Sequence, residues 1–289
     1  MRAPGPSRLD ALEPSSPLYT TDLFPPLHHE LITLLRGLSP EDWGRPTVAE
    51  EWKVRDLVAH LLDIDLRKLS VNRDGHLAAP PGPIRSNDEL VRFLNGLNAE
   101  WVAAARRLSP QVLVELLSFT GPLISELVAS LPPHEVSVFS VSWAGESESE
   151  NWFDVGRDYT ERWHHQMQIR DAVGAPLLLE RRWLYPLLDL SFRALPHAYR
   201  EVHAPGGTAV TVRISGDAVG AWSVIRSDGA WRLYRGAAPQ SAATVTLDPD
   251  SAWRLLYNAL PVRQAKQRSR VEGDASLAEP LFVMRSVMV

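Results

Sequence analysis

Residues 50–70, with the sequence EEWKVRDLVAHLLDIDLRKLS, set the periodicity that decides the fold of the first half of the chain. Apolar side chains recur here three and four residues apart, which places them on one face of an α-helix. These side chains are Val54, Leu57, Val58, Leu61, Leu62 and Leu69. His60 lies at the edge of this stripe. The stretch therefore predicts an amphipathic helix that packs against other helices and carries a histidine at its border.

The same helical period recurs on both sides of this stretch. Gly121-Pro122 should kink or split one of the segments, because a proline inside a helix removes a backbone donor. Ser86 and Glu89 form a capping-box signal, and Gly174 is expected to end the last helix. A short β-like piece is expected at 135–145. The further helical segments are 21–39, 86–109, 110–133 and 158–174. Four or five such helices joined by polar segments predict a helical bundle.

The pattern changes after about residue 180. One more helix is expected at 183–199, followed by alternating segments rich in Val, Thr, Trp and Tyr, which are typical of strands. Asp228-Gly229 between two of them predicts a hairpin turn. The expected strands lie within 208–217, 221–227, 230–236 and 243–250, and short helices within 250–260 and 274–288. The second half is therefore predicted to be a small antiparallel α+β domain.

The composition is that of a soluble globular protein. Hydrophobic residues make up 45 % of the 289 residues and charged residues 22 %, and the net charge of −5 gives no sign of a nucleic-acid or anionic-membrane partner. The apolar runs are shorter than the roughly 18 residues of a membrane span. Residues 1–17 are proline-rich and predict a disordered tail rather than a signal peptide, so we expect a cytoplasmic protein. The absence of cysteine excludes disulfides and thiolate metal ligands.

Residues 158–174, DYTERWHHQMQIRDAVG, contain a candidate metal-binding pair. Glu161 and His165 are four residues apart on the expected helix, so both side chains can reach one point. Zinc accepts a carboxylate and an imidazole at about 2.0–2.2 Å. The alternative is an ordinary surface ion pair. His164 competes with His165, but its neighbours on the helix are polar, so we expect His164 to face outward and His165 inward.

His60 is the best candidate for a third ligand, because it borders the apolar stripe of its own helix. The alternative is a hydrogen-bonded core histidine. Asp56 and Asp63 lie one turn to either side, where they either orient the imidazole or are solvated acids. Two imidazoles and one carboxylate leave an open position of the kind found at catalytic zinc sites.

Two segments resemble a known family. Residues 38–62 combine Trp52 with a Val-Arg-Asp turn and Ala-His-Leu, and resemble the N-terminal signature of the mycothiol-dependent maleylpyruvate isomerase family, part of the DinB/YfiT-like metal-binding four-helix bundles. Residues 159–174 are similar to its later helix. The resemblance implies a metal site formed by His60, Glu161 and His165. It also implies a DinB-like bundle over 18–175 and a sterol-carrier-like α+β domain over 180–289.

The sequence departs from the family at one position beside this site. Many relatives carry an acid three residues after the second histidine, where this chain has Gln168, so a substrate contact or a supporting acid is expected to differ. Further candidates for support or substrate binding are Trp52, Arg55, Asp56 and Arg162. Each arginine has the alternative of being a solvated or structural charge, and the tryptophan of being a core residue.

The resemblance implies a zinc-dependent isomerase or transferase that acts on a small electrophilic substrate. Its cofactor or co-substrate would be a low-molecular-weight thiol of the mycothiol or bacillithiol type, since this chain supplies no thiolate of its own. Two alternatives stay open: a hydrolase that uses metal-bound water, and a non-catalytic, metal-stabilised small-ligand-binding protein. Other divalent metals suit the same mixed ligands. The sequence identifies no catalytic acid or base, and both a monomer and a homodimer are compatible with it.

Overall fold

The computed structural model describes residues 12–49, 51–77, 82, 85–216 and 220–287, without the side chains of residues 87 and 88. Contacts divide the chain into two units. The helical unit contains the described residues within 19–138 and 150–177, and the sheet unit those within 1–18, 139–149 and 178–287. The domain boundaries expected from the sequence, 18–175 and 180–289, stay a prediction.

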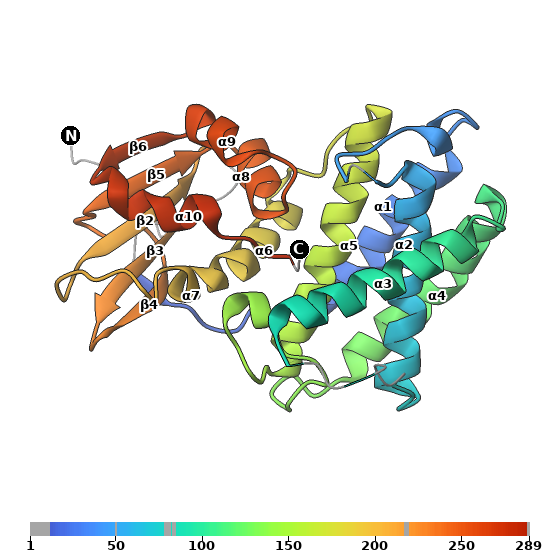
Figure 1. Ribbon diagram of the computed structural model, residues 1–289, viewed down its shortest axis with the longest axis horizontal. Coiled ribbons are helices and arrows are strands. Elements are labelled where there is room, and N and C mark those ends of the chain that lie inside the picture. The colour runs from blue at the N-terminus through green and yellow to red at the C-terminus, as the bar shows by residue number, and fades with distance from the viewer. Residues whose placement is uncertain (1–11, 50, 78–81, 83–84, 217–219, 288–289) are drawn as a thin grey trace, which may run out of the picture. The chain divides into compact units, whose positions relative to one another are not determined.

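Four helices of the helical unit form a closed square in which α1 contacts α4 and α5, and α2 contacts the same two helices (Figure 1). A further helix, α3, packs against α2. The bounds are α1 Phe24–Arg36, α2 Val54–Lys68, α3 Asn87–Ala105, α4 Pro110–Ser130 and α5 Asn151–Val173. Short turns of helix lie at Thr21–Leu23 and Asp42–Gly44, and a π-helical turn at Leu69–Arg73 follows α2. The predicted helical bundle is confirmed.

The apolar stripe of residues 50–70 lies in the core of this bundle. Val54, Leu57, Val58 and Leu62 of α2 have no exposed surface. They pack against a cluster drawn from α1, α4 and α5. α5 ends at Gly174, which adopts the left-handed conformation (φ 68°) expected of a glycine helix cap.

Of the two outcomes expected at Gly121-Pro122, a kink or a split, the split is wrong, because α4 runs through both residues as one helix. Pro122 is exposed, and both α1 and α2 pack against α4. Gly121 is needed for close packing here, since a Cβ at this position would lie 2.2 Å from the His28 ring. Tertiary contacts therefore outweigh the lost backbone hydrogen bond.

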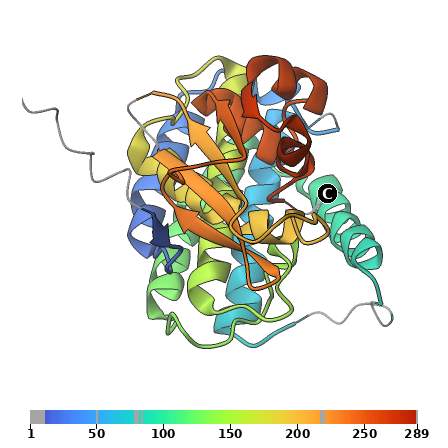
Figure 2. The same cartoon turned by 90° about the vertical axis from the view of Figure 1, so that its left-hand side faces the viewer.

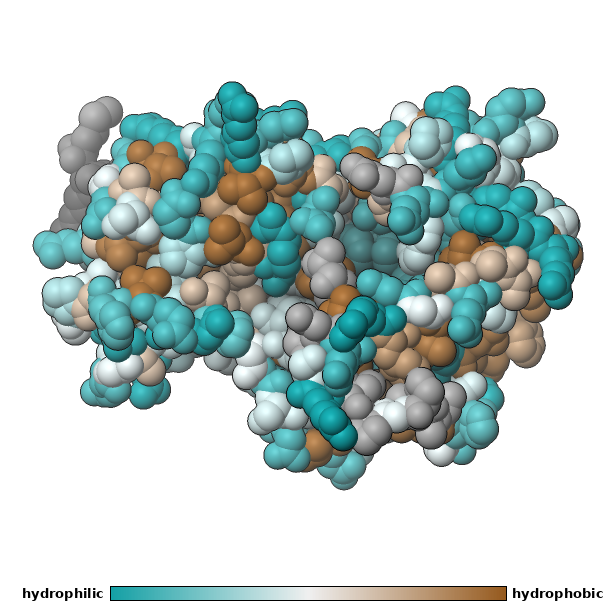
Figure 3. Space-filling view, in the orientation of Figure 1, coloured by the Kyte–Doolittle hydropathy of each residue, from teal (hydrophilic) through white to brown (hydrophobic). Residues whose placement is uncertain are grey.

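α4 is, among the described residues, the one helix long and apolar enough to cross a membrane by length and composition alone. Its most apolar window is 44 % buried inside the protein, where it forms part of the bundle core. A core helix satisfies the same criteria as a membrane span. The molecular face drawn in Figure 3 is mostly hydrophilic, with scattered hydrophobic patches.

The sheet unit contains a six-stranded sheet in the order β1-β4-β3-β2-β5-β6 (Figure 2). Asp228 and Gly229 both have positive φ and join β3 to β4, as the hairpin signal predicted. The expectation of a wholly antiparallel sheet is wrong, because β5 returns beside β2 and runs parallel to it. The strands are β1 Glu13–Pro14, β2 Ala209–Ile214, β3 Gly220–Ser227, β4 Ala230–Arg235, β5 Ala243–Leu247 and β6 Arg270–Gly273. The predicted α+β class is confirmed, with a mixed sheet.

β1 lies within the tail that the sequence predicted to be disordered. Residues 1–11 lie outside the described residues, but Glu13 and Pro14 pair with β4, which corrects the prediction for this part. The backbone carbonyl of Ser16 accepts hydrogen bonds from Arg193 and Arg235, whose guanidinium groups also contact the buried carboxylate of Asp189. An ion-pair cluster therefore fastens this segment to the edge of the sheet.

The helices of the sheet unit are short and lie behind the sheet in Figure 2. They are α6 Arg181–Ser191, α7 Leu195–Ala198, α8 Pro249–Leu256, α9 Val262–Arg268 and α10 Glu279–Val283, with turns at Ser142–Ala144, Phe192–Ala194 and Ala275–Ala278. The β-like piece expected at 135–145 is reduced to one isolated bridge, between Val136 and Glu150. Trp222 packs on Phe192 and its indole N–H donates to Asp189, so it is a core residue.

Candidate metal centre

His60, Glu161 and His165 lie together in the helical unit. One possible ligand atom from each lies within 4.8 Å of the other two. His165 Nε2 lies 3.5 Å from Glu161 Oε2. His60 comes from α2, whereas the other two residues come from successive turns of α5. Among the described residues, this is the group of potential metal ligands that the structure brings together.

A polar stripe on α5 positions this group. Its residues are spaced three and four apart, so they share one side of the helix. They are Asp154, Asp158, Glu161, His165 and Gln168. His60 of α2 meets the end of the stripe near Glu161 and His165, and Lys68 of α2 meets Asp154 and Asp158 at its start. α2 and α5 are therefore antiparallel along this contact.

The donor set fits a divalent ion. A tetrahedral ion with bonds of about 2.1 Å separates its ligand atoms by about 3.4 Å, close to the distance between His165 and Glu161. The widest separation in the group, 4.8 Å, exceeds this by about 1.4 Å. His60 Nδ1 is buried and has no hydrogen-bond partner among the described residues. A buried imidazole nitrogen without a hydrogen-bond partner is costly unless a further group, such as an ion, binds it.

The electrostatics keep His60 and Glu161 in the protonation states that metal ions require. Burial lowers the pKa of His60 well below its usual value, and the neighbouring His165 lowers it further, so the imidazole is neutral at pH 7. Burial alone raises the pKa of Glu161, but His164, His165 and Arg157 together hold it well below its usual value. A neutral imidazole and an ionised carboxylate therefore face each other.

Two of the supporting residues predicted from the sequence touch this group. Gln168 Oε1 lies 2.9 Å from His165 Nδ1, so the amide oxygen can accept that ring's N–H. The Trp52 ring lies 4.8 Å from the His60 ring and 6.4 Å from the His165 ring, measured between centroids. Trp52 thus covers both imidazoles on one side.

The acids and Arg55 do not support the ligands. Asp56 accepts the backbone N–H of Lys53 at the start of α2, and Asp63 pairs with Arg67, so the idea that either acid orients His60 is wrong. Arg55 donates to the backbone carbonyls at residues 106 and 108. Arg55 therefore fastens α2 to the segment after α3, whereas Asp56 caps α2 and Asp63 pairs within it.

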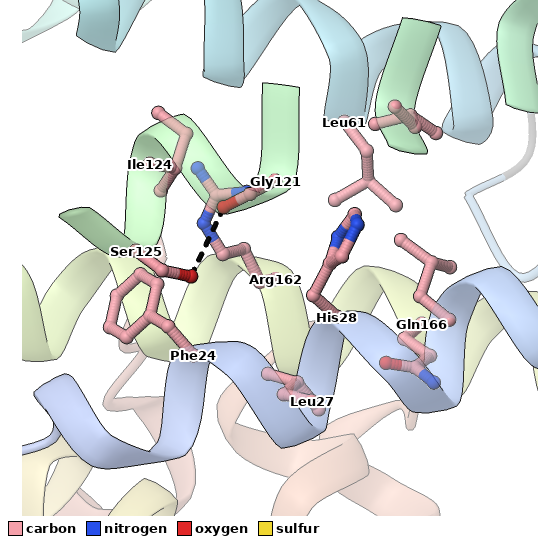
Figure 4. Close-up of a pocket in the computed structure, with 11 residues that line it drawn as sticks. Phe24, Leu27, His28, Leu61, Gly121, Ile124, Ser125, Arg162 and Gln166 are labelled. Carbon is pink, nitrogen blue, oxygen red and sulfur yellow. Dashed lines mark hydrogen bonds between the residues drawn. The ribbon is translucent and has the colours of Figure 1, made fainter. Parts of the chain in front are cut away.

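Arg162 faces a different part of the bundle. It pairs with the fully buried Asp65, which also accepts the hydroxyl of Thr120. Beside it lies a cavity of about 20 Å³ lined by all four bundle helices, with His28 and Gly121 on its walls (Figure 4). A cavity of this size accommodates a single water molecule. Arg162 therefore serves the bundle core.

The expected outward orientation of His164 is wrong. Its side chain is buried, and its Nδ1 lies 3.0 Å from the carbonyl oxygen of Thr160. Its ring lies tilted against the His165 ring, with centroids 3.9 Å apart. Burial and the neighbouring His165 lower the pKa of His164 to about 3. The sequence argument assumed one apolar face, but α5 is buried around almost its whole circumference.

Sequence reasoning missed a buried charge network at the start of the polar stripe. Lys68 Nζ lies 2.7 Å from Asp154 and 2.9 Å from Asp158, and Arg157 contacts both carboxylates. The regular spacing of acids on α5 was the signal available in the sequence. A lone Lys68 at the end of an apolar stripe gave no indication of its partner, because that depends on the helix pairing.

Comparisons with known proteins give a family model and solved structures that resemble this chain. The model of the mycothiol maleylpyruvate isomerase N-terminal domain matches residues 24–170, about half of the chain. A solved structure of the mycothiol-dependent maleylpyruvate isomerase is 12 % identical, with a TM-score of 0.51 over 81 % of this chain and 86 % of that one. A histidine-to-alanine mutant of that enzyme is also 12 % identical, with a TM-score of 0.54 over 87 % and 91 %.

At such low identity these two structures show a shared fold. No curated protein matches the sequence. The match of the family model over residues 24–170, which include every residue of the candidate centre, assigns the chain. This protein belongs to the mycothiol maleylpyruvate isomerase N-terminal domain family.

Proposed function

We propose that this protein is a metal-dependent enzyme that uses a low-molecular-weight thiol to isomerise a small electrophilic substrate or to transfer the thiol to it. The thiol would be of the mycothiol or bacillithiol type. The metal would be zinc or a similar divalent ion, held by His60, Glu161 and His165. The reaction resembles that of maleylpyruvate isomerase, which gives the family its name.

One observation carries the proposal: two imidazoles and a carboxylate from two helices meet at one point in a chain of this family. Three protein ligands of this type are typical of catalytic zinc sites, which keep one position open for water or substrate. The unpartnered Nδ1 of His60 and the ionised state of Glu161 support it.

A bound divalent ion would lower the pKa of a thiol in the open position, because a thiol that coordinates a metal ion is deprotonated. The chain's own residues prepare the site for this role. Gln168 fixes the ring orientation of His165, and Trp52 covers the rings of His60 and His165. The chain contains no cysteine, so the sulfur nucleophile would come from the small molecule.

A hydrolase is the less favoured alternative. Water-based hydrolysis needs a general base within hydrogen-bond reach of the nucleophile. Asp56 and Asp63, the acids nearest to His60 in sequence, are engaged at the helix start and with Arg67. The other alternative is a non-catalytic, metal-stabilised binding protein, which would bind the metal and a small ligand but would catalyse no reaction of a thiol.

Metal analysis tests the centre. Purified protein should hold about one equivalent of a divalent ion, and His60→Ala, Glu161→Gln and His165→Ala should each lose it. His76→Ala is the matched control, because His76 is an exposed histidine of the same unit. If the wild type binds no metal even after zinc is added back, the proposed centre is wrong.

Thiol dependence needs a separate measurement. Mycothiol or bacillithiol should change the absorption of the cobalt-substituted protein and produce a sulfur-to-metal charge-transfer band. If the protein binds cobalt but neither thiol changes its spectrum, the proposed metal centre stands and the proposed thiol mechanism is wrong.

We also propose the remaining features expected from the sequence. Residues 180–289 would form a sterol-carrier-like domain beside the metal-binding domain of residues 18–175. The protein would act in the cytoplasm on small molecules, without a nucleic-acid or membrane partner, as a monomer or homodimer. Size measurement in solution distinguishes the two oligomeric states.

A further inference from the structure

Gln168 is the neutral member of an otherwise titratable stripe on α5. Its side chain is buried, and its amide oxygen lies 2.9 Å from His165 Nδ1. When Nδ1 of the neutral ring donates to this oxygen, Nε2, which lies 3.5 Å from Glu161 Oε2, is free to bind an ion. A carboxylate in place of Gln168 could accept the same hydrogen bond, but it would add a negative charge beside the metal ligands.

The other buried charges on this face balance one another. Lys68 and Arg157 carry two positive charges, and Asp154 and Asp158 carry two negative ones. Imidazole ligands bind metal ions in their neutral form. Glu161 is therefore the single uncompensated charge of the described residues that make up the stripe and its partners.

A divalent ion on this set gives a centre with a net charge of +1. One monoanionic ligand in the open position brings the buried centre to zero, whereas a neutral ligand leaves a charge behind. Buried uncompensated charge is costly, and charges interact more strongly where water is excluded. A carboxylate at residue 168 would shift this balance by one unit.

We propose that Gln168 is a positioning residue that also sets the charge of the centre, so that the centre selects one monoanionic ligand such as a thiolate. This inference rests on the proposed metal-binding function and does not require thiol chemistry. It predicts that the choice of an amide rather than an acid at residue 168 controls affinity for anions.

Azide titration of the cobalt-substituted protein, followed by absorption, tests the inference with a small monoanion. Gln168→Glu should weaken azide binding by at least about tenfold, because the added negative charge repels the anion where water is excluded, while keeping or raising the affinity for cobalt. Gln168→Met removes the hydrogen bond without changing the charge. It should weaken cobalt binding but leave the azide affinity of the loaded protein within about threefold of wild type.

A second variant acts in the opposite direction and keeps the test valid if Gln168→Glu does not fold. Asp158→Asn removes one negative charge near Glu161 and should tighten azide binding. Equal azide affinity in wild type, Gln168→Glu and Asp158→Asn would overturn the inference, as would a loaded wild type that binds no azide. A wild type that binds no metal would instead reject the proposed function.

Discussion

Replacing Lys68 with methionine tests whether the buried charge network holds α2 and α5 together. Lys68 is the residue that α2 contributes to this network. Its ammonium group lies 2.7 Å from Asp154 and 2.9 Å from Asp158. The lysine and aspartate side chains are at most 5 % exposed. Methionine keeps most of the volume of the lysine stem, so the substitution chiefly removes the charge.

The expected loss is about 3 kcal/mol of unfolding free energy. Removing one partner of a buried ion pair costs about 3–5 kcal/mol, because the remaining charge stays buried without compensation. The low end applies here, since Arg157 still contacts Asp154 at 2.6 Å and Asp158 at 3.2 Å. For a chain of this size, such a loss lowers Tm by about 6–12 °C.

Urea unfolding followed by circular dichroism measures the effect. A second substitution, Asp158→Asn, restores the charge balance in the Lys68→Met protein, so the double variant should be at least about 1 kcal/mol more stable than the sum of the single effects. The reasoning is refuted if Lys68→Met loses less than about 1 kcal/mol, or if the two substitutions are simply additive.

Three further predictions follow from the same bundle. Burial raises the pKa of Asp154, but Arg157 and Lys68 outweigh burial and hold that pKa below the unfolded value of 3.8. The ionised carboxylate therefore stabilises the fold above about pH 4, and this stabilisation is lost as the pH falls through the folded-state pKa. Asp154→Asn should make the unfolding free energy depend less on pH in acid titrations. Gly121→Ala should cost about 1–3 kcal/mol because its Cβ meets the His28 ring, and His28→Ala should remove most of that cost in a double-mutant cycle of urea unfolding. Free zinc at 100 times its Kd should raise the unfolding free energy by about 2.7 kcal/mol, and a chelator should abolish this gain. In thermal melts, zinc should raise the Tm of the wild type but not that of Glu161→Gln.

Much of the fold could be predicted from local patterns. The apolar period of residues 50–70 identified α2, and the Asp228-Gly229 pair identified the β3–β4 hairpin. What local patterns could not provide were features decided by distant contacts. Arg193 and Arg235 donate hydrogen bonds to the backbone of Ser16 next to β1, and α1 and α2 pack against α4, which contains Pro122.

The candidate metal centre was likewise only partly predictable from local patterns. The four-residue spacing of Glu161 and His165 is a property of one helix, so the sequence alone placed these two side chains together. His60 was proposed from its place at the edge of the apolar stripe, and the family resemblance supported that choice. Its proximity to Glu161 and His165 depends on the antiparallel pairing of α2 with α5, which no local pattern gives. The orientation of His164 was mispredicted, because helix-face reasoning does not apply to a helix buried on almost every side.

The two outer strands of the sheet bear on the protein's behaviour at high concentration. An open strand edge offers free amides and carbonyls to another molecule, and proteins block it with short strands, proline or charge. One edge here ends in the two-residue β1 with Pro14, and the other in β6 with Arg270 and Glu272. An affinity tag or truncation that displaces residues 13–16 would uncover the end of β4 at Tyr234 and Arg235 and favour self-association, so tags are best placed without disturbing this segment.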